Sequence, residues 1–196
     1  MPLAAATFWE IKSPATPCSI VISSIATQRR LLTQNPTNSF VGAVRIKEIA
    51  AVIAQKTASA TPGEYNLMIG TDSQNFDTTK VVIVIALHNV GHGGIFFYEV
   101  QHVRRISNVG QKLLYETQLS LDCAEKLVAE FEEMKQVGTF DFEKHLSMTI
   151  HVDAGQNGPS KQVIPQIIGW ITSCGYKAVV KPDSYAACSI ANKYSK

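Results

Sequence analysis

The sequence predicts an α/β domain with a mixed five-stranded sheet, in which three antiparallel strands precede two βα units and helices flank the sheet. Three observations support this prediction. Three strand-like runs with short loops occupy residues 65–103, a long amphipathic helix occupies 108–136, and two strand-and-helix units follow. The chain has 196 residues, 45% hydrophobic and 17% charged, so it is long enough for one domain with a sizeable core.

The first part of the domain is predicted to be a helix and a three-stranded meander. Apolar residues recur at near-helical spacing over 40–58, which predicts a helix there. Residues 65–72 and the β-branched run 80–90 predict two strands, and "IFFYEVQHV" at 95–103 predicts a third. Because only short loops separate these runs, and "GHGG" at 91–94 is typical of a hairpin turn, we expect antiparallel pairing.

The second part of the domain alternates helices and strands. Apolar spacing predicts the helix 108–136, and strict alternation predicts a strand over 146–153. A helix then follows in which Pro165 implies a kink or a late start. A short strand at 176–181 and a final helix over 182–194 complete the pattern. Right-handed crossovers place the fourth and fifth strands parallel to the first.

Residues 1–38 differ in composition from the rest of the chain. They contain one acid, Glu10, together with several serines and threonines, four prolines and the pair Arg29 and Arg30. We interpret them as a poorly structured N-terminal extension and 39–196 as the domain. An acid-poor segment of this kind fits either an organelle transit segment or an extension without a targeting role.

The cysteines and the hydropathy pattern favour an intracellular, cytoplasmic protein with no membrane span. The four cysteines form no CxxC pair, zinc-binding spacing or disulfide framework. No uninterrupted apolar run approaches the ~18–20 residues that a membrane helix needs. The net charge of +2 identifies no partner by itself.

Two carboxylates follow strands that we expect to be neighbours in the sheet. Asp72 ends the first predicted strand in "IGTDSQ", and Asp153 ends the fourth. If these strands are adjacent and parallel, both side chains emerge at the edge where α/β sheets bind ligands. Taken singly, each aspartate is equally well explained as a turn residue.

Two further acids are predicted to lie near this edge. Glu116 lies on the flank of the core-facing stripe of its helix, and Asp183 stands at the junction between the fifth strand and the last helix. Glu116 has a simpler interpretation as a surface partner of Lys112, and Asp183 as a helix N-cap. All four acids nevertheless fall at matching places in one topology. Converging carboxylates repel unless a cation lies between them, and oxygen ligands select Mg²⁺ or Mn²⁺.

The order of elements and the positions of the acids resemble the ribonuclease H-like superfamily, and within it the YkuK family of predicted nucleases. The resemblance rests on five motifs that cover most of the chain from residue 64: "IGTDSQ", "GGIFFY", "YETQLSL", "HVDAGQNGPS" and "GYKAVVKPDSYAA". It implies a ribonuclease H-like fold. It also implies that Asp72, Glu116, Asp153 and Asp183 are catalytic and bind metal.

Three other residues are candidates for supporting roles. His151 shares a predicted strand face with Asp153, which suits a position behind the metal ligands or a role in proton transfer, although a packed or surface histidine fits equally well. Lys161 and Lys181 lie close in sequence to Asp153 and Asp183, so we expect them to contact nucleic-acid phosphates.

Two functions are consistent with these features. The first is a metal-dependent nuclease that hydrolyses phosphodiester bonds of RNA, RNA–DNA hybrid or structured DNA with two Mg²⁺ or Mn²⁺ ions. The second is a non-catalytic nucleic-acid-binding or scaffold domain of the same fold. The four acids favour catalysis, and a titration with either metal separates the two, because a scaffold need not respond.

Overall fold

The computed structural model describes residues 19–24, 46–60, 64–155 and 160–196. The strands are β1 (Ser19–Ser24), β2 (Tyr65–Asn75), β3 (Thr79–Asn89), β4 (Gly93–Val103), β5 (Leu146–Val152) and β6 (Lys177–Val180). The helices are α2 (Ile46–Thr57), α3 (Val109–Gln136), α4 (Phe142–His145), α5 (Ile164–Ser173), the π-helix η1 (Ala186–Ala191) and α6 (Asn192–Ser195). No helix in these ranges combines the length and the apolar character needed to cross a membrane.

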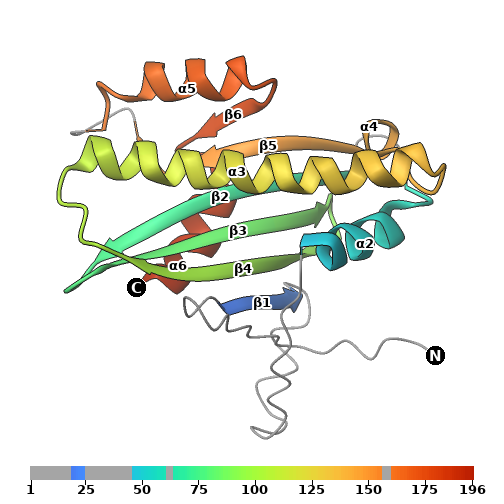
Figure 1. The fold of residues 1–196 in the computed structure, drawn as a ribbon, viewed down its shortest axis with the longest axis horizontal. Helices are drawn as coiled ribbons and strands as arrows, with labels where there is room; N and C mark the ends of the chain where they lie inside the picture. The colour runs from blue at the N-terminus through green and yellow to red at the C-terminus, as the bar shows by residue number, and fades with distance from the viewer. Residues whose placement is uncertain (1–18, 25–45, 61–63, 156–159) are drawn as a thin grey trace, which may run out of the picture.

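The strands form a single mixed sheet in the order β1-β4-β3-β2-β5-β6. Strands β2, β3 and β4 form the expected antiparallel meander, and β5 and β6 run parallel to β2 on its other side. The predicted five-stranded mixed sheet is therefore confirmed, including the position of the crossovers. In Figure 1 the carboxyl ends of β2, β5 and β6 all point toward the left-hand edge of the sheet.

A sixth strand, β1, pairs antiparallel with the outer edge of β4. The sequence pattern did not predict it, and it lies within the segment 1–38 that we interpreted as an extension. Residues 1–18 and 25–38 lie outside the described residues. The domain boundary after residue 38 stays a prediction.

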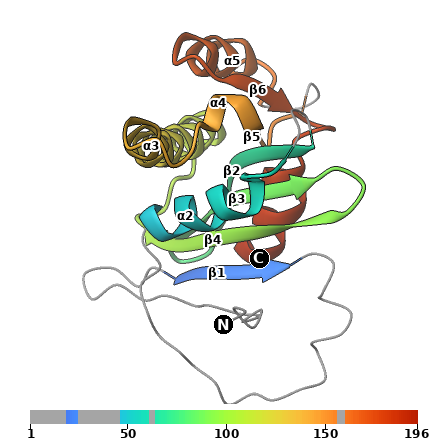
Figure 2. The same cartoon turned by 90° about the vertical axis from the view of Figure 1, so that its right-hand side faces the viewer.

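Helices cover both faces of the sheet (Figures 1 and 2). On one face, α2, α3 and α5 pack against a core that includes Leu67, Ile69 and Ile150. On the other face, the smaller pair η1 and α6 packs against residues such as Met68 and Phe96. Alternation along β2 thus sends odd-numbered side chains toward α3 and even-numbered ones toward α6.

Four elements differ in detail from the sequence prediction. Strand β2 continues past Asp72 to Asn75, because β3 pairs with it along its whole length. Helix α5 begins at Ile164 with Pro165 in its first turn, so the proline marks a late start and not a kink. The last helix is divided into η1 and α6, and the four-residue helix α4 was not predicted.

Candidate active site

The parallel pairing of β2 and β5 places Asp72 next to Asp153. The last pair in the ladder is Thr71 with Val152, so the two aspartates are the next residues on neighbouring strands. Burial raises the pKa of Asp72, and the charge of the Asp153 carboxylate raises it further. The expected adjacency of the two strand segments is therefore confirmed, and the shared reach of their carboxylates to one ion stays a prediction. Asp72 does not end its strand, which continues to Asn75; it directly follows the part of β2 that pairs with β5.

Glu116 reaches the same edge from the opposite face of the sheet. Its side chain is only 4% exposed, and its Oε1 accepts a hydrogen bond of 2.5 Å from Oγ of Ser73. One helical turn further along α3, Oγ of Ser120 lies 2.8 Å from Oγ1 of Thr71. These two contacts fix α3 against β2, so Glu116 approaches from the α3 side while Asp72 lies on the α6 side.

The two aspartates have different partners. Oγ of Ser195 on α6 donates a hydrogen bond of 2.6 Å to Oδ2 of Asp72, which is 8% exposed. This bond lowers the pKa of Asp72, against a larger increase caused by burial. The Lys181 ammonium lies 2.6 Å from Oδ1 of Asp153, whose side chain is 12% exposed. A hydroxyl group and an ammonium group thus contact the two carboxylates.

Burial and neighbouring carboxylates make ionisation of the carboxyl groups in this site unfavourable. Burial, together with the charges of Asp72 and Asp153, raises the pKa of Glu116 to about 8. Burial and the Asp153 charge likewise raise the pKa of Asp72. Lys112 lowers the pKa of both groups, and its Nζ donates a hydrogen bond of 2.8 Å to the Ser73 carbonyl oxygen. A bound cation would favour the ionised form of all these carboxylates at neutral pH.

His151 lies on the same face of β5 as Asp153 and supports the helix above it. Its Nδ1 accepts a hydrogen bond of 3.2 Å from the Ala186 N–H at the start of η1. Its Nε2 lies 3.0 Å from Oγ1 of Thr149. Burial lowers the pKa of His151 to about 4, so the ring is neutral at pH 7. The two ring nitrogens thus contact Ala186 and Thr149. A role of His151 in proton transfer stays a prediction.

The fourth predicted acid lies at the surface. Asp183 is exposed in the turn between β6 and η1, where its N–H donates to the Val180 carbonyl and its own carbonyl accepts from the Tyr185 N–H. Asp72 and Glu116 are therefore buried, Asp153 is partly buried and affects the pKa of both, and Asp183 is exposed. Its role as a metal ligand stays a prediction.

The two predicted phosphate contacts are placed differently. Lys161 is exposed in the turn before α5. Lys181 is half-exposed and forms the ion pair with Asp153 described above. Its charge thus lies within the site, and its contact with a phosphate stays a prediction.

Carboxylate oxygens are the ligands that hard divalent cations prefer, but the three side chains are not positioned around a common point. Within the described ranges, no group of three or more His, Cys, Asp or Glu side chains is arranged to hold a metal ion as it stands. The oxygens of Asp72, Glu116 and Asp153 instead accept from Ser195, Ser73 and Lys181. Binding of a metal would require some of these contacts to be exchanged.

Sequence reasoning missed three residues of this site. Ser73 could have been found, because alternation along β2 directs it toward α3. For Lys112 the sequence suggests only a surface pair with Glu116, whereas its Nζ donates a hydrogen bond to the β2 backbone. Ser195 gave no signal, because its contact depends on how η1 and α6 fold back over the sheet.

Comparisons with known proteins agree with this architecture. Residues 47–196 match the family described as ribonuclease H-like. The chain is 34% identical over 138 residues to the uncharacterized protein YkuK of Bacillus subtilis (strain 168), an alignment that covers 67% of this chain and 80% of that protein. No solved structure matched the chain. The fold, the family match and this relative together establish that the chain belongs to the YkuK family of ribonuclease H-like proteins.

Proposed function

We propose that this protein is a metal-dependent nuclease that hydrolyses phosphodiester bonds of RNA, RNA–DNA hybrid or structured DNA. One observation carries the proposal. The buried Asp72 on β2 and Glu116 on α3 and the partly buried Asp153 after β5 lie near the carboxyl ends of the parallel strands, where burial and the charges of the two aspartates raise the pKa of Glu116. A buried cluster of like charge with no catalytic or binding role would be costly to keep.

The three carboxylates offer the oxygen ligands that Mg²⁺ and Mn²⁺ prefer. In this proposal Asp72 and Asp153 hold the metal from adjacent strands, Glu116 from α3, and Asp183 joins from the surface turn. When bound, such ions lower the pKa of an attacking water and stabilise charge on the leaving oxygen of the phosphodiester.

The basic and neutral groups around the carboxylates have separate roles in the proposal. Lys112 places its ammonium group beside Asp72 and Glu116, because its Nζ is anchored on the β2 backbone. Lys181 exchanges Asp153 for a substrate phosphate, and Lys161 contacts a phosphate further away. His151 positions η1 and stays neutral, because its pKa of about 4 lies well below pH 7.

A non-catalytic nucleic-acid-binding domain is the alternative, and one observation favours it. Lys181 and Ser195 of the same chain contact Asp153 and Asp72. In a domain that has lost catalysis, these contacts would be permanent. The response of the protein to Mg²⁺ or Mn²⁺ separates the two functions.

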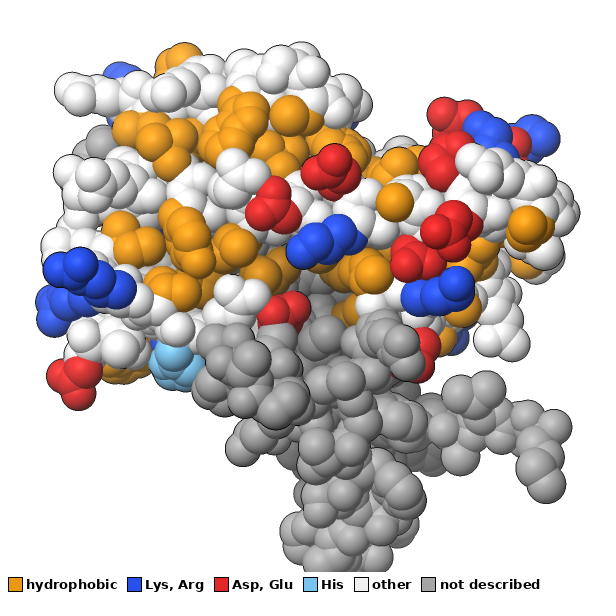
Figure 3. All heavy atoms as spheres, in the orientation of Figure 1, with side chains coloured by type: hydrophobic (Ala, Val, Ile, Leu, Met, Phe, Trp, Pro, Cys, Tyr) orange, Lys and Arg blue, Asp and Glu red, His pale blue; other side chains and the backbone are white. Residues whose placement is uncertain are grey.

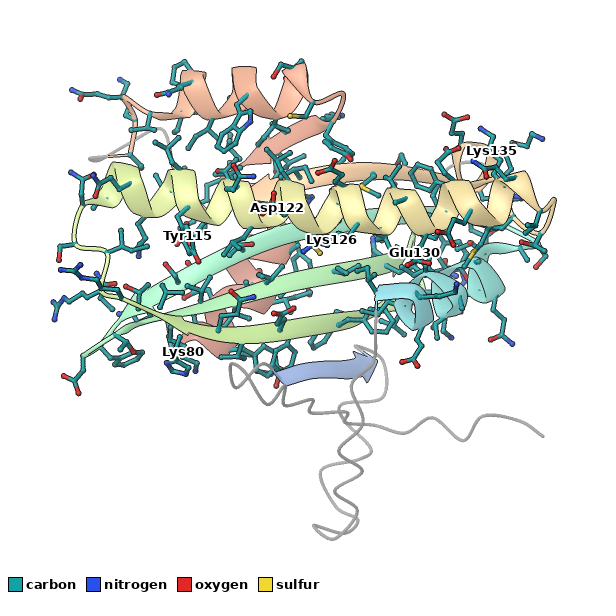
Figure 4. All side chains as sticks on the ribbon, in the orientation of Figure 1. Lys80, Tyr115, Asp122, Lys126, Glu130 and Lys135 are labelled. Carbon is teal, nitrogen blue, oxygen red and sulfur yellow. The ribbon has the colours of Figure 1, made fainter. Side chains whose placement is uncertain are left out.

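The test is a cleavage assay with labelled RNA, RNA–DNA hybrid and branched DNA, each with Mg²⁺, Mn²⁺ or chelator. We expect cleavage of at least one substrate with metal alone, and loss of cleavage in Asp72→Asn. Asp122→Asn is the matched control, because Asp122 lies on the outer side of α3 (Figure 4) and bonds to Gln118. Cleavage in chelator, or in Asp72→Asn, would contradict the metal mechanism. No cleavage of any substrate, with no effect of either metal on the protein, would favour the binding-only function.

A further inference from the structure

We propose that the tip of the β2–β3 hairpin, together with Arg104 and Arg105, is a binding platform for single-stranded nucleic acid. Phe76 at this tip would stack on an unpaired base while the two arginines contact the adjoining phosphates. The inference rests on the proposed function for the kind of substrate, and it adds where an unpaired part of that substrate binds.

The aromatic ring is presented to solvent on a fixed backbone. Phe76 directly follows the last residue of β2 and is 51% exposed. Its N–H donates a hydrogen bond of 2.8 Å to the Thr78 carbonyl, and its own carbonyl accepts one of 3.2 Å from Nη1 of Arg105. The backbone beneath the ring is thus held on both sides. A large apolar ring held in water by its own backbone contacts is suited to stacking, because little order is lost on binding.

A polar network joins the hairpin tip to the segment that carries the arginines. Nδ2 of Asn75 donates a hydrogen bond of 2.9 Å to the Ile106 carbonyl. Oγ1 of the fully buried Thr79 donates one of 2.7 Å to Oδ1 of Asn75 and accepts one of 2.8 Å from the Ile106 N–H. The tip and the connection between β4 and α3 therefore form one unit. This unit holds the ring of Phe76 and the two arginines at one end of the sheet.

The charge at this end of the molecule suits a polyanion. Arg104 and Arg105 are both exposed. Figure 3 shows one group of basic side chains at the end of the sheet where the hairpin turns; along α3 and toward its far end, acidic and basic side chains are mixed. Asp77 is an exposed acid at the same tip, so it weakens the local positive field. Arginine side chains can both neutralise phosphates and stack on bases.

The platform lies close to the candidate active site along the same strand. Phe76 is four residues beyond Asp72, which corresponds to ~13 Å at the ~3.3 Å rise of a strand. At ~3.4 Å per stacked nucleotide, this length spans about four nucleotides. The bases of a continuous duplex are stacked on each other and offer no free face, so the ring of Phe76 would select an unpaired segment beside the cleaved bond.

The test measures binding in chelator, where cleavage does not interfere. Fluorescence anisotropy is recorded for a labelled single-stranded RNA, the same sequence as DNA, and a blunt duplex, over a range of salt concentrations. The variants are Phe76→Ala, Phe76→Trp and Arg104→Ala/Arg105→Ala. Val137→Ala and Lys56→Ala are controls, because Val137 (72% exposed) lies at the opposite end of α3 and Lys56 is an exposed cation at the end of α2.

We expect Phe76→Ala to weaken single-strand binding about five-fold or more, with little effect on the duplex, and Phe76→Trp to restore it. The double arginine variant should show a weaker salt dependence, with a slope smaller by about 0.7 for each phosphate that the protein no longer neutralises. Both controls should bind like the unmodified chain. The RNA and DNA arms show whether the 2′-hydroxyl contributes.

Equal binding by Phe76→Ala and Val137→Ala, or an equal loss on duplex and single strand, would overturn the platform. These results are independent of catalysis. If the protein cleaves no substrate yet Phe76→Ala loses single-strand binding, the nuclease function fails and the platform stands. If cleavage depends on Asp72 while Phe76→Ala binds normally, the platform alone fails.

Discussion

At the scale of single residues, the candidate site consists of carboxylates and the hydroxyl and ammonium groups that contact them. Asp72 and Asp153 could be predicted, because each follows a strand-like run and adjacent parallel strands bring such residues together. Glu116 was predictable from its angle on α3. The contact of Ser195 with Asp72 was not, because it joins residues that are 123 positions apart in the chain.

Glu116→Gln should change how stability depends on pH in the metal-free protein. Its pKa rises from 4.5 to about 8 on folding, so the folded chain binds more protons than the unfolded chain between these values. Stability must therefore fall as pH rises through this window, by an amount on the order of a few kcal/mol, since one pKa unit corresponds to about 1.4 kcal/mol. The variant should lose much of this dependence and be the more stable protein near pH 8. Thermal melts in chelator from pH 4.5 to 9 measure this, with the exposed Glu132→Gln as control. Identical pH profiles for Glu116→Gln and the unmodified chain would contradict the assignment.

Lys181→Met should strengthen metal binding. The Lys181 ammonium competes with a cation for Asp153, and methionine keeps the length of the side chain without the charge. Because a half-exposed ion pair contributes up to about 1 kcal/mol, we expect Mn²⁺ to bind several-fold more tightly. Isothermal titration with Mn²⁺ measures the effect, and Lys177→Met, an exposed cation on β6, is the control. Weaker Mn²⁺ binding by Lys181→Met would show that the lysine supports the metal instead of competing with it.

At the scale of elements, the sequence predicts those helices and strands whose residue pattern lies within a short window. The alternation of β5 and the periodicity of α3 are properties of short windows, and both elements were predicted within a residue or two of their bounds. The extension of β2 to Asn75 and the edge strand β1 depend on a neighbouring strand that supplies hydrogen bonds. The division of the last helix into η1 and α6 likewise reflects packing against the sheet, which no short window encodes.

Tyr194→Ala should loosen α6 and disturb Asp72. The Tyr194 ring stacks on Tyr98 with centroids 4.2 Å apart and lies 5.9 Å from Phe96, so it anchors the helix that carries Ser195. Loss of this half-buried ring should cost about 1–3 kcal/mol of stability. Denaturant unfolding measures the loss. Tyr185→Ala, which removes an exposed ring nearby, should cost much less. Equal losses in the two variants would mean that α6 is not held by this stack.

At the scale of the whole molecule, the sheet order explains why the acids meet. Three antiparallel strands followed by parallel crossovers put β2 beside β5, and this arrangement could be predicted from the order of elements and the handedness of crossovers. Asp183 shows the limit of that reasoning. Its place after β6 follows from topology, but the orientation of the turn, which leaves the residue exposed, depends on packing of η1 against the sheet. The same topology places the β2–β3 hairpin tip, and the β4–α3 connection that carries Arg104 and Arg105, at the end of the sheet that also holds Asp72.

In the proposed function, Asp72, Glu116 and Asp153 together hold a divalent cation. The most direct measurement is an anomalous difference map from crystals of the full chain soaked in Mn²⁺. We expect a peak between the carboxylates of Asp72 and Asp153, with the Lys181 ammonium displaced from Asp153, and no such peak in crystals of Asp72→Asn. A map without density at this edge, in which Ser195 and Lys181 keep their contacts with the two aspartates in millimolar Mn²⁺, would contradict the claim.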